Sequence, residues 1–137
     1  MLGLREVVVD NYIQIILLAA VADGEIKEDE LQVIHKLKTH HPRFKSVSDD
    51  QANQIVANVY NKISAGMEIK HILEQMASNM NENEKNVAYA LAKEMCVSDF
   101  HYPSSEVNFI KLIEEIWSIS DEVIEKVDFS IQLRYFN

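Results

Sequence analysis

Turn-forming residues and cysteine are scarce in this sequence. Its 137 residues include three glycines, two prolines and a single cysteine. So few turn residues argue against the many short connections of an all-β sandwich or barrel, and one cysteine excludes an internal disulfide. We therefore expect a helical protein that folds in a reducing compartment. Cys96 falls on an apolar face of a predicted helix, where we expect it to be buried as packing.

Positive charge is also in short supply. Lysine and arginine number 13 against 22 aspartates and glutamates, which gives a net charge of −9. This excess repels nucleic-acid phosphates and favours cations, so we expect no nucleic-acid partner. The apolar run at residues 13–22 is too short to span a bilayer, and no basic segment precedes it as in a signal peptide. The expected location is cytoplasmic, without direct membrane insertion.

Hydrophobic residues, in contrast, make up 47% of the chain and recur at helical spacing. Ser48 with Gln51 and Asn81 with Glu84 form capping-box patterns, and Gly66 has the position of a helix terminator. These signals predict an all-α fold, a single domain over residues 1–137 with about seven helices. The expected helices cover residues 5–21, 28–39, 49–65, 67–79, 82–97, 104–118 and 120–134.

An acidic turn at residues 22–31 separates the first two predicted helices. Asp23, Gly24 and Glu30 have the spacing of the second half of an EF-hand calcium loop. The first half is missing, because Ala19 and Val21 stand where that loop has its first oxygen ligands. A complete EF-hand is therefore excluded, and a cation at this turn would need ligands from another part of the chain.

A second acidic turn supplies candidates for those ligands. Asp99 and Glu106 match Asp23 and Glu30 at a constant offset of about 76 residues, and His101 matches Glu25. The apolar faces of the preceding helices match at the same offset. We interpret this as an internal repeat, about residues 5–40 and 82–118.

The Ala-Asp-Gly-Glu-Ile sequence at residues 22–26, followed by Glu30 and by a second Asp-x6-Glu, resembles the tellurite-resistance TerB-like family. That fold also occurs as the N-terminal domain of DnaJ-like proteins. The resemblance implies an all-helical domain of two pseudo-symmetric halves whose acidic motifs cluster on one metal-binding surface. Carried over, the cluster is Asp23, Glu30, Asp99 and Glu106. Phe100 replaces a common glycine in the second motif, and Lys27-Glu28 replaces the usual Ser-Pro in the first.

Four converging carboxylates repel one another unless a cation or protons compensate. Helix capping explains each carboxylate by itself but not the occurrence of two matching acidic motifs. Oxygen ligands favour calcium, with magnesium next, and Glu25 is a further candidate ligand. Coordination by His101 would shift the preference toward a transition metal. The expected function is thus a non-enzymatic, divalent-metal-binding stress-response protein. Its partners would be proteins, including a membrane-associated stress-response complex at the inner membrane face.

The sequence leaves two alternative functions open. The first is an adaptor that presents its acidic surface to a basic protein without metal; its binding would be sensitive to salt but not to chelators. The second is a metal-dependent hydrolase in which the carboxylates hold a metal that activates water. No Ser/His/Asp or Cys/His set and no phosphate-binding glycine loop is present, so no catalytic residue is assigned.

Overall fold

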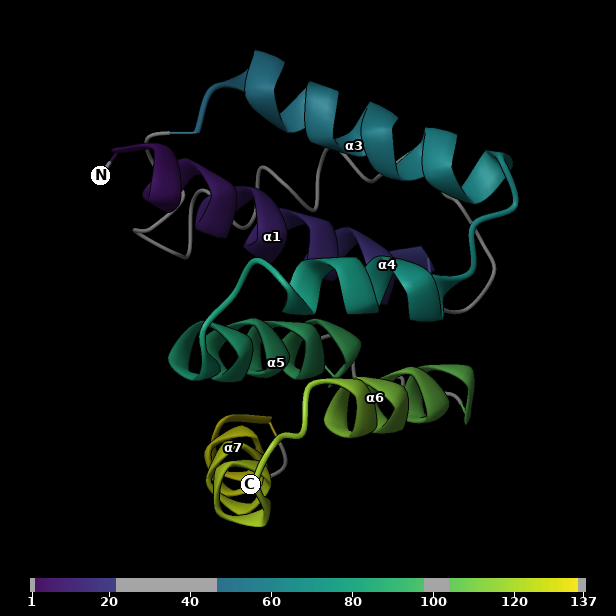
Figure 1. Ribbon diagram of the computed structural model, residues 1–137. Helices are drawn as coiled ribbons and strands as arrows, with labels where there is room; N and C mark the ends of the chain where they lie inside the picture. The colour runs from purple at the N-terminus through teal and green to yellow at the C-terminus, as the bar shows by residue number, and fades with distance from the viewer. Residues whose placement is uncertain (1, 22–46, 98–103, 136–137) are drawn as a thin grey trace.

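A computed structural model describes residues 2–21, 47–97 and 104–135, and within these ranges every element is a helix. The all-α class is therefore confirmed for the part of the chain that is described. Six helices are present, and the predicted helix over residues 28–39 lies outside the described residues, so the count of seven stays a prediction. Figure 1 shows the six helices: α1 (Leu2–Val21), α3 (Asp49–Ser64), α4 (Ile69–Ala77), α5 (Glu82–Val97), α6 (Ser104–Ile116) and α7 (Asp121–Tyr135).

Helix α1 is the centre of the core. From Asn11 to Ala19 all its side chains but that of Gln14 are buried, which agrees with the continuous apolar run in the sequence. A helix that is apolar on all sides must be covered by neighbours on several sides. Helix α3 packs on one side of α1 and α5 on another, and the contact with α5 is the largest between any two described helices.

The helix boundaries follow from local capping chemistry, as the sequence predicts. The Ser48 hydroxyl accepts a hydrogen bond from the Gln51 amide at 3.1 Å and begins α3. Asn81 and Glu84 form a reciprocal capping box, with backbone-to-side-chain bonds of 2.9 and 2.8 Å, at the start of α5. Gly66 has a φ of 89° just after α3, where the chain must turn and a side chain would be strained.

Helices α6 and α7 cover α5 on the side away from α3. Helices α4 and α5 each pack against α6, and α7 packs against α5 at the far side of the molecule from α3 (Figure 1). One buried hydrogen bond ties the end of α6 to α4, since the Trp117 indole N–H donates to the Leu73 carbonyl at 2.9 Å. Cys96 is buried, as predicted. No helix in the described ranges is long and apolar enough to cross a membrane.

Candidate functional site

The six residues predicted to bind metal fall almost entirely outside the described part of the chain. Asp23, Glu25 and Glu30 lie between α1 and α3, and Asp99 and His101 lie between α5 and α6, in segments outside the described residues. Glu106 is the third residue of α6, and only its backbone is described. In that first turn a carboxylate is stabilised by the helix dipole whether or not it binds metal. Convergence of the six residues stays a prediction.

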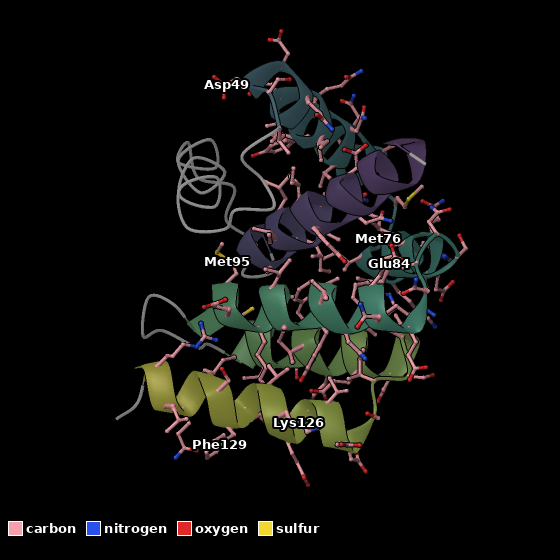
Figure 2. The ribbon with its side chains drawn as sticks, turned by 90° about the vertical axis from the view of Figure 1, so that its left-hand side faces the viewer. Asp49, Met76, Glu84, Met95, Lys126 and Phe129 are labelled. Atoms are coloured by element: carbon pink, nitrogen blue, oxygen red, sulfur yellow. The ribbon has the colours of Figure 1, made fainter. Side chains whose placement is uncertain are left out.

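The backbone of the two helices that lead into the acidic turns is described over their whole length. Helix α1 ends at Val21 and α5 ends at Val97, and each end comes two residues before the aspartate of its turn. Figures 1 and 2 show α1 and α5 running in the same general direction, with their carboxyl ends at the same end of the molecule. The contact between them is the most extensive between any two described helices.

The matched apolar faces of these two helices are both used for packing. On α1 the matched positions Tyr12, Ile13, Ile15, Ile16 and Ala19 are all buried. On α5 their counterparts Ala88, Tyr89 and Ala92 are buried, while Leu91 and Met95 are half-buried against the same core. Three of these five matched pairs are therefore buried in both helices, and the other two are buried in α1 but half-buried in α5. Superposition of the two halves needs the segments outside the described residues and stays a prediction.

A polar network fixes α5 against its two outer neighbours. The fully buried Tyr89 donates its hydroxyl to Glu114 of α6 at 2.6 Å and accepts a bond from Lys93 at 3.3 Å. Lys93, in turn, forms an ion pair with Asp128 of α7. The next residue, Glu94, pairs with Arg134 of α7. These contacts hold the helix that carries the second acidic turn in a single orientation.

Sequence reasoning missed this network. The only local signal was the four-residue spacing of Tyr89 and Lys93, which puts them on one side of a helix. Glu114 and Asp128 come from other helices, and their pairing depends on the way the helices pack. These ionisable groups have a structural role, because each of them contacts a side chain of another helix.

No chemical centre is visible elsewhere in the described ranges. They contain no group of three or more histidine, cysteine, aspartate or glutamate side chains that could hold a metal ion. A shallow hollow at the corner between α3 and α4 is lined by Met67, His71 and Glu74, among others. His71 lies 3.8 Å from Glu74, but both side chains are solvent-exposed, and no third ligand lies near them among the described residues. This pair does not make a site.

Comparison with protein-family models, with curated proteins and with solved structures finds no match to this chain. The TerB-like resemblance therefore continues to depend on the two acidic motifs and on the helices that precede them.

Proposed function

We propose that this chain is a TerB-like, non-enzymatic protein that binds a divalent cation, calcium first, between its two acidic turns. One observation carries the proposal. Helices α1 and α5 pack side by side and run in the same direction, so that the two chain segments with the acidic motifs leave from one end of the molecule (Figure 2). The ligands would be Asp23, Glu30, Asp99 and Glu106, with Glu25 and His101 as additional candidates.

Chain geometry supports a shared site. Asp23 and Asp99 each follow a helix end by two residues, and two residues span at most about 7 Å. Axes of packed helices lie about 8–10 Å apart. Two aspartates on such short tethers can reach one cation between the helix ends, whereas helices running in opposite directions would separate them by the helix length.

The cellular role follows from the resemblance and from the charge. Under this proposal the protein acts in the cytoplasm as part of a stress response of the tellurite-resistance type. It reaches the inner membrane face only through protein partners. Its net charge of −9 fits a cation-binding role and disfavours contact with anionic lipid or nucleic acid.

The proposal is tested by thermal melting of chelator-treated protein with calcium, magnesium, manganese or zinc. A ligand bound only by the folded state stabilises it by RT ln(1 + [L]/Kd), about 2.7 kcal/mol at a hundredfold excess over Kd. Calcium should therefore raise the melting temperature by several degrees. Asp23→Asn and Glu106→Gln should each abolish that rise and leave the helical content unchanged. Glu74→Gln, which removes one exposed carboxylate from α4, is the matched control and should retain it.

A melting temperature that no divalent ion changes would refute cation binding and leave the acidic turns as helix caps. Substitution of a cap would then cost up to about 1 kcal/mol with or without metal. Hydrolysis of p-nitrophenyl phosphate by metal-loaded protein, lost in Asp23→Asn, would replace the binding role with a catalytic one.

A further inference from the structure

Helix α7 presents an apolar pair to solvent. Phe129 is 65% exposed and Leu133 is 49% exposed, and these are the two large hydrophobic side chains that are exposed among the described residues. They are four residues apart and so lie on one face of the helix. Figure 2 shows Phe129 on the outer side of α7, turned away from α5. The opposite face is anchored, with Ile131 buried and Val123, Ile124 and Val127 packed against the core.

The surroundings of this pair are acidic. Glu122, Glu125 and Lys126 precede Phe129 by seven, four and three residues, so all three lie on the exposed side of the helix. Lys126 forms an ion pair with Glu122 at 2.9 Å, so the two together add no net charge to this face. Glu125 has no ion-pair partner among the described residues, and the N-terminal turn adds Asp121. The face therefore combines two apolar side chains with a negative rim.

Two nearby basic residues are engaged in ion pairs between α7 and α5. Lys93 pairs with Asp128, and Arg134 pairs with Glu94, so both join α7 to α5. These pairs leave the outer face with its negative charge and also fix the helix on the body of the protein. A surface that is already ordered loses little conformational entropy when a partner binds.

We propose that the outer face of α7, centred on Phe129 and Leu133 with Glu125 at its edge, docks a basic amphipathic helix of a partner protein. Phe129 and Leu133 are four residues apart, which matches the i, i+4 spacing of apolar residues on one side of the partner helix. The acidic rim around them complements the lysines or arginines of that helix. The charge complementarity decides against a second copy of this chain, because each copy carries the same negative face and a net charge of −9. This surface is distinct from the acidic turns and does not depend on the cation.

The probe is a fluorescently labelled amphipathic peptide of leucine and lysine, about four helical turns long. It is titrated into the full chain and followed by anisotropy. Phe129→Ser should weaken binding by at least about tenfold, because one large apolar contact is lost. Ala57→Ser, at an exposed position of α3, is the matched control and should change nothing. Glu125→Lys should weaken binding much more than Glu74→Lys, which makes the same change of net charge on α4.

Three results would overturn the proposal. The first is equal affinity for wild type and Phe129→Ser, which would show that the peptide binds elsewhere. The second is equal binding of a leucine and glutamate peptide of the same pattern, which would remove the charge argument. The third is a wild-type dimer in sedimentation that Phe129→Ser dissociates, because a second copy would then be the occupant. Circular dichroism of each variant verifies that the helices are retained.

Discussion

The Tyr89 hydroxyl is the best point at which to test the packing of α5. Tyr89→Phe removes a bond of 2.6 Å to Glu114 and one of 3.3 Å from Lys93 and keeps the ring. The Lys93 ammonium, 5.7 Å from the ring centroid, keeps its aromatic contact and its pair with Asp128. Hydrogen bonds to charged groups contribute about 1.5–3 kcal/mol. Because Glu114 is half-exposed and water can replace the hydroxyl, we expect a loss near the lower value, about 1.5 kcal/mol.

The loss is measured by urea denaturation, followed by circular dichroism and by the fluorescence of Trp117, the single tryptophan. The midpoint should fall while the slope of free energy against urea stays the same, since the surface exposed on unfolding is unchanged. A double-mutant cycle with Glu114→Ala isolates the bond, and the coupling energy should be about 1 kcal/mol. If Tyr89→Phe lowers the free energy of unfolding by the same amount in the wild type and in Glu114→Ala, the bond between Tyr89 and Glu114 does not stabilise the protein.

Three further outcomes follow from single residues. Gly66→Ala should lower the free energy of unfolding by about 1–2 kcal/mol in chemical denaturation. The reason is the φ of 89°, which disfavours a side chain although no atom lies within 4 Å of an added Cβ. Gly66→Asn should lower it by less. Asn11→Leu should raise the unfolding free energy by about 1 kcal/mol, because the buried Asn11 Nδ2 has no hydrogen-bond partner in the described structure. The Lys126 hydrogen bond and charge lower the pKa of Glu122 below 4.5, so an NMR titration should show this pKa rising in Lys126→Ala. The ion pair stabilises the fold at a pH above the pKa that Glu122 has in the unfolded chain. That contribution is lost as the pH falls through the lowered pKa of Glu122 in the folded protein.

Local chemistry made much of the fold predictable from the sequence. Ser48, Asn81 and Gly66 act on backbone groups within a few residues of themselves, so their roles do not depend on the rest of the structure. The last helix follows the same logic, because the Ser120 hydroxyl accepts from the Val123 amide at 3.2 Å. The apolar run of α1 likewise predicts a buried helix, since few arrangements other than a central position cover all its sides.

Contacts between distant segments could not be predicted in the same way. The Trp117 bond to Leu73 joins residues 44 positions apart, and the Arg134 pair with Glu94 joins residues 40 apart. Such pairs depend on helix crossing angles, which the periodicity of one helix does not specify. The exposure of Phe129 was missed for a related reason: its spacing suits a buried face as well as an exposed one, and only the packing of α7 on α5 distinguishes them. The metal ligands share this limit, because their convergence depends on how two halves of the chain meet.

Helix α5 takes part in both proposals, since it leads to the second acidic turn and also holds α7. Energetic coupling between two sites requires an element with two arrangements that both ligands can bias. Nothing in the described contacts of α5 has that character: Tyr89 is fully buried, and Lys93 and Glu94 are both engaged by α7. We therefore expect saturating calcium to change the affinity of the leucine and lysine peptide by less than about twofold at constant ionic strength. The variant Asp23→Asn should leave that affinity equally unchanged. A calcium-dependent affinity that persists in Glu106→Gln would place the cation on α7 itself, whereas one that disappears in that variant would show that α5 moves when the turns bind metal.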